Sequence, residues 1–544
     1  MKRGLCFTAL TAVLAVSLVF SSVHAIPASA SPAKQWDSPA PLSSVLHKGS
    51  GKSAGMIEEP LEQIDDMMEM EVESGTAPGI VAFVAKSGHI VKHEAYGYSA
   101  LYVDDQGTKM SKPTKMTAHT IFDIASISKI FTTTAAMILY EDGLFNLDDP
   151  VALHLPEFAA NGKEQVTIRQ LMTHTSGFTS WVPLYQQEGG RKERIEYALH
   201  YPLANTPGES YTYSDLNLIA LGALIEKFSG MRLDKFIDKE LTGPLGMKDT
   251  MYNPPASLKE RIAATEFQPA LGRGMVWGEV HDENAWSLDG VAGHAGVFST
   301  ALDLGKLAHM FLNDGKYGGQ RILEKETVRM LETNQIPEFP GNDHGLGWEL
   351  NQGWYMDALS HSATFGHTGY TGTSIVINRD NHTTAILLTN RVHPSRTTVS
   401  TNFIRRKFAR AVADSISVPL NKKEEAWFSG YGDQLNRQMT VAADGALRLT
   451  FDVWNRIEQD SDYGSIETSV DGENWSEAVL RLTGDSEGWT SHEIGLPKET
   501  QFVRFRYVTD GSVNGRGLYI KNLKADGERI EPLNEQNGWT LRDY

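Results

Sequence analysis

The sequence of 544 residues contains a single cysteine, Cys6, close to its N-terminus. One thiol excludes an intramolecular disulfide and leaves the rest of the chain without thiol chemistry. Basic residues are also outnumbered, because 50 Lys and Arg stand against 68 Asp and Glu, giving a formal charge of -18. This acidic balance argues against a nucleic-acid partner and against binding to anionic membrane surfaces.

Beyond the N-terminus, the sequence lacks any apolar run long enough to span a bilayer. Residues 5–20 are apolar and uncharged, follow two basic residues, and precede small-residue sites that allow cleavage after Ala25 or Ala30. This arrangement is typical of a signal peptide, and the run is short for a membrane anchor. We expect residues 1–25 to be an export signal, no membrane span after cleavage, and a secreted or cell-wall-associated bacterial protein.

Composition divides the remaining chain into three segments. Residues 26–55 are rich in Ser, Ala, Pro, Gly and Lys, which predicts a flexible leader. Residues 56–420 have strand patterns near both ends and helical patterns between them, which predicts an α+β fold with one sheet covered by helices. Residues 425–544 contain short alternating strands with Gly, Asp and Asn turns, which predicts an all-β sandwich.

Two hairpins and two helices are predicted near the ends of the middle segment, and helical patterns alternate with Gly- and Pro-rich loops between them, over about residues 117–320. The hairpins join residues 79–86 to 89–96 and residues 373–378 to 383–389, each through a short polar turn. A helical pattern begins near Met56, and a last helix covers about 397–415.

Ser126 and Lys129 are the first candidates for chemistry. Residues three apart at the start of a helix share a face, so the Lys129 amine can reach the serine hydroxyl and, when desolvated, accept its proton. The spacing alone is weak, because Ser31 and Lys34 match it within the expected leader. The surroundings differ, since Ser126 follows an apolar stretch and precedes a helix rich in small residues.

Two later segments carry polar groups whose function depends on such a serine. Tyr213 and Asp215 precede a predicted helix, where a tyrosine is ordinarily a core residue with a satisfied hydroxyl. His367-Thr368-Gly369, followed by Tyr370, precedes the predicted strand at 373, and taken alone it favours a turn.

In this order, the three segments together resemble the serine β-lactamase and penicillin-binding protein superfamily. His-Thr-Gly as the third motif is similar to the class C-like branch of DD-peptidases, D-amino-acid amidases and esterases. The resemblance spans about residues 57–415 and includes the segments 147–156, 168–177 and 293–299. It implies an antiparallel sheet flanked by helices, with an all-helical subdomain.

The resemblance also implies roles for individual residues. Ser126 would form an acyl-enzyme, and Lys129 and Tyr213 would relay its proton, without a metal or other cofactor. The oxyanion hole would be made by the backbone amides of Ser126 and Tyr370. The residues expected to contact the substrate are Asp215, His367, Thr368 and Gly369.

Two departures from the family pattern concern charge. Asp215 stands where penicillin-recognising members usually have Asn, and an unpaired carboxylate there would repel a substrate carboxylate. His367 replaces a Lys, which weakens the fixed positive charge at neutral pH. Both departures argue against efficient β-lactamase activity.

Three functions remain open at this point. Segments 278–285 and 291–296 look most like cell-wall members, which implies cleavage of an amide bond in a muropeptide, as a DD-carboxypeptidase or an N-acetylmuramyl-L-alanine amidase. The alternatives are an esterase acting on small esters or D-amino-acid derivatives, and a penicillin-binding sensor that acylates without turnover.

One group of residues in the middle segment raises the question of a bound metal. A metal could be bound by His281, Asp282, Glu283 and His294. Their spacing does not match that of zinc ligands, so we interpret them as loop residues that form hydrogen bonds.

The C-terminal segment resembles jelly-roll accessory domains of secreted bacterial hydrolases. Trp475 and Trp489 there suggest a cell-wall glycan as partner, although such tryptophans are more often core residues. Asp471 and Asp510 could hold structural calcium or simply shape turns.

Overall fold

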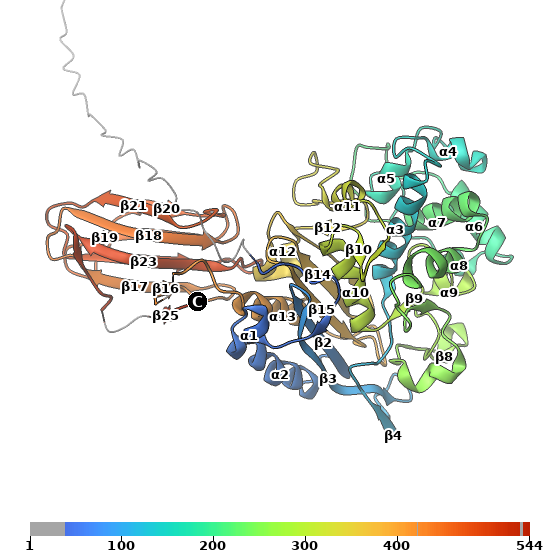
Figure 1. Cartoon of the computed structure of the whole chain (residues 1–544), viewed down its shortest axis with the longest axis horizontal. Helices are drawn as coiled ribbons and strands as arrows, with labels where there is room; N and C mark the ends of the chain where they lie inside the picture. Colours follow the sequence, from blue (N-terminus) through green and yellow to red (C-terminus); the bar gives the residue numbers. More distant parts are fainter. Residues whose placement is uncertain (1–38, 422, 534–536) are drawn as a thin grey trace, which may run out of the picture.

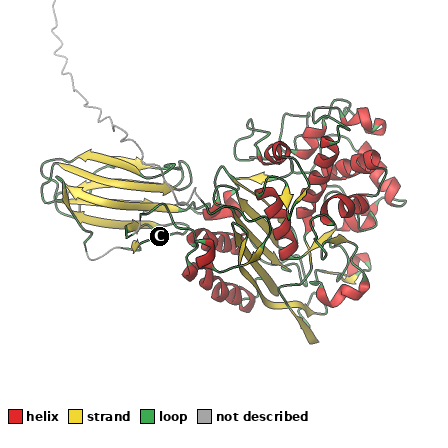
Figure 2. Ribbon diagram, viewed as in Figure 1, coloured by secondary structure: helices red, strands yellow, loops and turns green. Residues whose placement is uncertain are grey.

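The computed structural model describes residues 39–421, 423–533 and 537–544, so the expected signal peptide lies outside the described residues. Figures 1 and 2 show two bodies side by side, a larger one in which helices surround a sheet and a smaller one built of strands. Across the three described ranges, no helix is both long and apolar enough to cross a membrane.

The larger body is organised around an eight-stranded sheet in the order β1-β3-β2-β15-β14-β13-β12, with β4 paired to β3. All pairings are antiparallel except that of β1 with β3. Strands from the two ends of the body meet where β2 pairs with β15, which confirms the predicted α+β fold. The strands are β1 (His47–Lys48), β2 (Gly79–Lys86), β3 (His89–Tyr102), β4 (Lys109–Lys115), β12 (Glu349–Leu350), β13 (Thr364–Gly369), β14 (Thr373–Asn378) and β15 (Thr383–Thr389).

The central strands are apolar throughout because both faces of the sheet are covered. Successive side chains of β2 alternate between two cores: Val81 and Phe83 enter one, and Ala82 and Val84 enter the other. The first core contains α3 (Ser128–Glu141) and α10 (Ala301–Leu312), and the second contains α2 (Glu58–Glu73) and α13 (Asn402–Asp414). The four segments predicted as hairpin strands are β2, β3, β14 and β15.

Most of the remaining helices come between β4 and β12 in the sequence, and they form the helical region around α3 in Figure 1. The α3 helix is almost wholly buried, and its threonines are tolerated because their hydroxyls donate to backbone carbonyls, as Thr132 does to Gly293 at 2.7 Å. The other helices are α4 (Val151–His154), α5 (Ile168–Met172), α6 (Arg191–His200), α7 (Asp215–Ser229), α8 (Leu233–Ile237), α9 (Glu283–Ser287), α11 (Lys325–Glu332) and α12 (Gly353–Met356). The described part of the larger body also contains seven short strands outside the main sheet: β5 (Phe122–Asp123), β6 (Met251–Tyr252), β7 (Phe267–Gln268), β8 (Gly274–Met275), β9 (Val297–Ser299), β10 (Lys316–Tyr317) and β11 (Gln320–Arg321).

Two local expectations differ from the structure. The segment expected as a leader up to residue 55 contains β1 and α1 (Gly51–Ala54), because Ser50 and Ser53 cap the helix reciprocally and Leu42 and Leu46 pack on the first core. The segment from 366 to 369, which alone favoured a turn, is the end of strand β13, because it pairs with β14 residue by residue.

The smaller body is a sandwich of two antiparallel sheets around its own apolar core. One sheet has the order β21-β18-β23-β16-β25, with β24 beside β23, and the other has the order β17-β22-β19-β20. The strands are β16 (Ala426–Phe428), β17 (Asn436–Ala442), β18 (Arg448–Arg456), β19 (Tyr463–Ser469), β20 (Leu480–Leu482), β21 (Thr490–Gly495), β22 (Phe502–Val508), β23 (Gly517–Ala525), β24 (Glu528–Arg529) and β25 (Thr540–Arg542).

The two tryptophans singled out in the sandwich are half-buried and partnered by cations. Arg504 lies over the Trp475 ring at 4.2 Å, and Lys521 lies over the Trp489 ring at 4.3 Å. The Trp489 indole also donates to the carbonyl of Pro419 at 2.5 Å. One face of each ring is therefore already occupied by the protein.

Candidate active site

Ser126 lies in a single tight turn between β5 and α3. Ala125, just before it, has φ +46°, a left-handed conformation that residues with a side chain rarely adopt. The Ala125 amide donates to one oxygen of the buried Asp123 carboxylate at 2.8 Å, and the His281 amide donates to the other at 2.6 Å. Burial raises the pKa of Asp123 against the opposing effect of these amides. Asp123 therefore fixes the turn that presents Ser126.

The Lys129 side chain is 1% exposed, and its ammonium is surrounded by oxygen partners. It donates to the Ser126 hydroxyl at 2.9 Å and to the His294 carbonyl at 3.2 Å, and it lies 2.8 Å from Asp215 Oδ1. Burial is the largest single influence on the pKa of Lys129 and lowers it, but the charge and hydrogen bonds of Asp215 and Tyr213 together outweigh burial, so the pKa lies above its ordinary value. Lys129 is therefore a cation in the resting site.

Tyr213 lies on the extended segment immediately before α7. The Lys129 ammonium is 4.8 Å from its ring centre, and the phenol shares hydrogen bonds with Lys129 and Ser126. Burial raises the pKa of Tyr213, and the neighbouring Lys129 charge only partly offsets this. The structure thus brings together all three residues of the predicted proton relay.

Three buried histidines lie at or behind the Tyr213 ring: His174 and His367 are beside the ring, and His344 is beside His174. Burial lowers the pKa of His344 to about 4 and that of His367 to about 3, and it also holds the pKa of His174 well below its ordinary value. His174 Nδ1 accepts from the Ser214 amide at 3.1 Å, which orients the segment that carries Tyr213. All three rings are therefore neutral supports at physiological pH.

His367 differs from its expected role as a substrate contact. Its side chain is buried, its ring centre lies 6.1 Å from that of Tyr213, and its Nδ1 pairs with the Thr368 carbonyl at 2.7 Å. Successive residues of a strand point to opposite faces, so Thr368 lines the pocket and His367 lies behind it.

Asp215 also differs from expectation. The predicted repulsion of a substrate carboxylate required an unpaired aspartate, whereas the structure pairs Asp215 with Lys129. The ligand atoms of Asp215, Asp282 and His294 lie within 4.8 Å of one another, and His294 Nε2 is 2.9 Å from Asp282. The Lys129 ammonium already supplies positive charge to this cluster.

A pocket of about 380 Å³ opens above Ser126. Its walls come from β12, α12, the end of β13, the segment after β15 and the start of α13: Ser126, Tyr213, Glu349, Trp354, Thr368, Gly369, Tyr370, Arg391, Ser400, Thr401, Asn402 and Arg405. Gly369 must lack a side chain, because a Cβ there would lie 2.4 Å from the Ile124 carbonyl. This close approach places the Tyr370 backbone beside the Ser126 turn.

Two arginines give the pocket positive charge. Arg405 is buried and donates to the carbonyls of Gly369 and Thr373 at 2.8 and 3.0 Å. Arg391 lies 5.1 Å from the ring centre of Tyr370, donates to the Tyr370 carbonyl at 3.3 Å, and forms no ion pair with any described residue. Neither arginine was among the predicted site residues, because neither belongs to a recognisable motif.

Glu349 titrates in the pocket wall near neutral pH. Burial raises its pKa to about 7, from an ordinary value of 4.5. Between these values the folded protein keeps a proton that the unfolded chain has released, so the folded state loses stability as the pH rises from 4.5 to 7. We expect Glu349→Gln to match the wild type in melting temperature near pH 4 and to exceed it at pH 8. A difference that is equal at both pH values, measured by thermal unfolding, would contradict this assignment.

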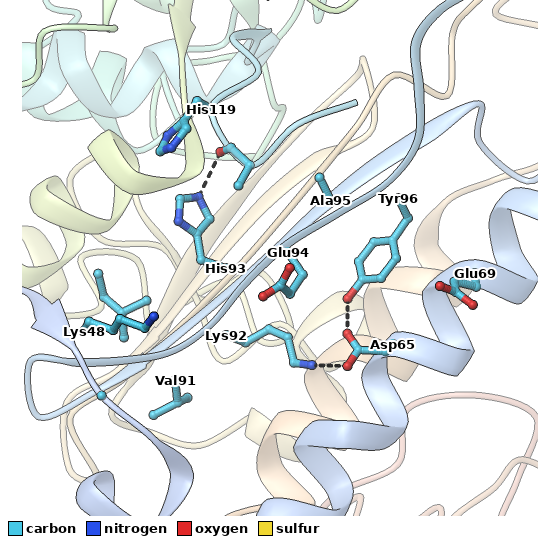
Figure 3. Close-up of a pocket in the computed structure, with 13 residues that line it drawn as sticks. Lys48, Asp65, Glu69, Val91, Lys92, His93, Glu94, Ala95, Tyr96 and His119 are labelled. Carbon is cyan, nitrogen blue, oxygen red and sulfur yellow. Dashed lines mark hydrogen bonds and ion pairs between the residues drawn. The ribbon is translucent and has the colours of Figure 1, made fainter. Parts of the chain in front are cut away.

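A larger trough of about 760 Å³ lies elsewhere, along β3 and α2 (Figure 3). Lys92 is paired with Asp65 at 2.7 Å, and Tyr96 donates to the same carboxylate. His93 contacts the Ala118 carbonyl at 2.9 Å. The residues lining this trough include no serine with a neighbouring base, so it does not compete with the Ser126 pocket as a catalytic site.

Comparison with known proteins agrees with this geometry. The family described as Beta-lactamase matches residues 64–409. A protein of Escherichia coli K12 named "Putative D-alanyl-D-alanine carboxypeptidase" is 33% identical over 382 residues, which cover 64% of this chain and 86% of the relative.

Solved structures share the fold at low identity. A penicillin-binding protein homologue from Caulobacter crescentus is 18% identical with a TM-score of 0.51 and covers 66% of this chain and 99% of its own. An octameric penicillin-binding protein homologue from Pyrococcus abyssi is 20% identical with a TM-score of 0.50 and covers 85% of this chain and all of its own. The chain therefore belongs to the β-lactamase family and is a serine hydrolase of the β-lactamase and penicillin-binding protein superfamily.

Proposed function

We propose that this protein is an exported DD-carboxypeptidase, which removes the terminal D-alanine of muropeptides through an acyl-enzyme on Ser126. The observation that carries the proposal is the uncompensated guanidinium of Arg391 on the pocket wall, beside the Tyr370 ring. A guanidinium without a carboxylate partner suits the free carboxylate that ends a D-Ala-D-Ala peptide. The name of the Escherichia coli relative agrees with this substrate.

The charge of Asp215 does not oppose such a substrate. Its carboxylate is 2.8 Å from the Lys129 ammonium, so the pair is close to neutral when seen from the pocket. Arg405 adds a second positive group to the pocket lining. The one opposing carboxyl in the lining, Glu349, is partly protonated near pH 7, so the two guanidiniums outweigh it. The pocket therefore favours a leaving group that carries a carboxylate, which an ester or an internal amide does not supply.

The proposed reaction uses the residues already brought together. Ser126 Oγ attacks the carbonyl carbon of the penultimate D-alanine as its proton passes to Lys129, and Lys129 passes one of its own protons to the Asp215 carboxylate. The Tyr213 phenol, hydrogen-bonded to both Ser126 and Lys129, orients this transfer. The backbone amides of Ser126 and Tyr370 stabilise the oxyanion. The network then returns the proton to the leaving amine, and water hydrolyses the ester on Ser126.

Arg391→Ala is the substitution that tests the substrate class. Loss of a charge-assisted contact of about 1.5–3 kcal/mol should lower kcat/KM by about 10- to 100-fold for a peptide ending in D-Ala-D-Ala. The same peptide with an amidated C-terminus should change by less than about threefold, and Arg391→Lys should keep part of the activity. Equal losses on both peptides would contradict a role for Arg391 in carboxylate recognition.

Mass spectrometry of muropeptides before and after treatment identifies the bond that is cut. The proposal predicts products shorter by one alanine. Release of the whole stem peptide from muramic acid would instead identify an N-acetylmuramyl-L-alanine amidase.

A further inference from the structure

Three carboxylates from separate loops of the sandwich lie together. Glu458 follows β18, Asp462 precedes β19, and Asp510 follows β22. One oxygen from each lies within 4.8 Å of the others. The charged groups that act on Glu458 are the other two carboxylates, Asp462 and Asp510.

Other carboxylates near the cluster add little net charge to it, because they are paired with an arginine. Asp433 and Asp357 also act on Asp462, but each of these two is paired with Arg406, at 2.5 and 3.2 Å. Burial together with the nearby carboxylates raises the pKa of Asp462 to about 6 and that of Glu458 to about 7. The cluster therefore has an unbalanced negative charge that its own surroundings do not neutralise.

At Asp462, neither solvent nor hydrogen bonds fully compensate the negative charge. Its side chain is fully buried, and its Oδ1 accepts from the Asp510 amide at 3.0 Å. Its Oδ2 is buried and has no partner among the described residues, and the same holds for Glu458 Oε2. Buried carboxylate oxygens are normally hydrogen-bonded, paired or bound to a metal.

We propose that Glu458, Asp462 and Asp510 bind a divalent cation of the calcium type. The donors are all carboxylate oxygens from loops, with no His or Cys, which suits a hard cation. Ca²⁺ accepts irregular oxygen geometry and completes its shell with water, whereas Mg²⁺ demands a near-ideal octahedron. The site lies outside the Ser126 pocket, and the proposal does not rest on the proposed carboxypeptidase activity.

The site also has a physical connection to the larger body. Val513, three residues after Asp510, packs on Gly353 so closely that a Cβ at 353 would lie 2.3 Å from Val513 Cγ1. The next residue, Trp354, lines the Ser126 pocket. A cation bound at Asp510 would hold the loop that supports this wall.

The test uses the full-length protein, stripped with EDTA and dialysed, in calorimetric titrations and thermal unfolding with CaCl₂ or MgCl₂. We expect one Ca²⁺ per chain and a rise in melting temperature of about 3–8 °C at saturation, with a smaller response to Mg²⁺. Asp462→Asn and Asp510→Asn should remove the Ca²⁺ response. Asp510 is exposed, so its substitution leaves the sandwich core intact.

Asp471→Asn is the matched control, because Asp471 is an exposed acid of the same sandwich. Its oxygens accept from the Glu473 and Asn474 amides and close a turn. This variant should respond to Ca²⁺ as the wild type does. Absence of Ca²⁺ binding by the wild type, or an unchanged response in Asp510→Asn, would overturn the proposal.

Discussion

Replacement of Ser126 with alanine is expected to abolish turnover, with kcat falling by about 10⁶-fold. The Ser126 hydroxyl lines the pocket and lies 2.9 Å from the Lys129 ammonium. In the alanine variant, a water that takes the place of this hydroxyl would not be held and activated as a nucleophile in the same way. The substitution removes one partly exposed oxygen, so the melting temperature should stay within about 2 °C of the wild type.

Ser128→Ala provides the matched control on the same turn. Ser128 is buried and its hydroxyl accepts from the Val297 amide at 3.0 Å, so its loss should cost about 1 kcal/mol of stability. The nucleophile remains in place, and kcat should stay within about tenfold of the wild type. Retained turnover in Ser126→Ala, or an equal loss in Ser128→Ala, would contradict the assignment of Ser126.

Lys129→Ala should have the second-largest effect, a loss of about 10³- to 10⁴-fold in kcat. The amine is the group that connects the serine hydroxyl to Asp215 and Tyr213, so its removal interrupts the route of the proton. It also leaves Asp215 without its cation, and breaking a largely buried pair should cost about 3 kcal/mol of stability.

The double variant Lys129→Ala with Asp215→Asn separates these two effects. Removing the unpaired carboxylate should restore most of the lost stability and none of the activity. The measurements are kcat and the free energy of unfolding for each variant. If the double variant regained activity, the role of Lys129 would be charge balance and not proton transfer.

The fold was predictable from the sequence where a strand or helix carries its own periodic signal. The run from 79 to 86 is apolar throughout because β2 is buried on both faces, and the short turn after it marks the hairpin. In contrast, the Ser, Gly and Lys content of residues 39–55 predicts a leader, while the tertiary contacts of Leu42 and Leu46 hold this segment on the core. Composition does not report such contacts.

The site was predictable only as far as its motifs extend. Ser126, Lys129 and Tyr213 were assigned through the resemblance, and the structure brings them within contact of one another. The pairing of Asp215 with Lys129 could not be read from spacing, because it joins two helices distant in the sequence. Arg391 and Arg405 reach the pocket only through the packing of β15 and α13, which gives them no local signature.

An acyl-enzyme on Ser126 can be detected directly by mass spectrometry of the intact protein, quenched with acid during turnover of a peptide whose C-terminal D-alanine carbonyl is a thioester. A thiolate is a good leaving group, so acylation should be fast and the acylated form should accumulate. We expect one added acyl group on the proteolytic peptide that contains Ser126, and none in Ser126→Ala. An acyl group on another residue, or equal labelling of the alanine variant, would show that Ser126 is not the nucleophile.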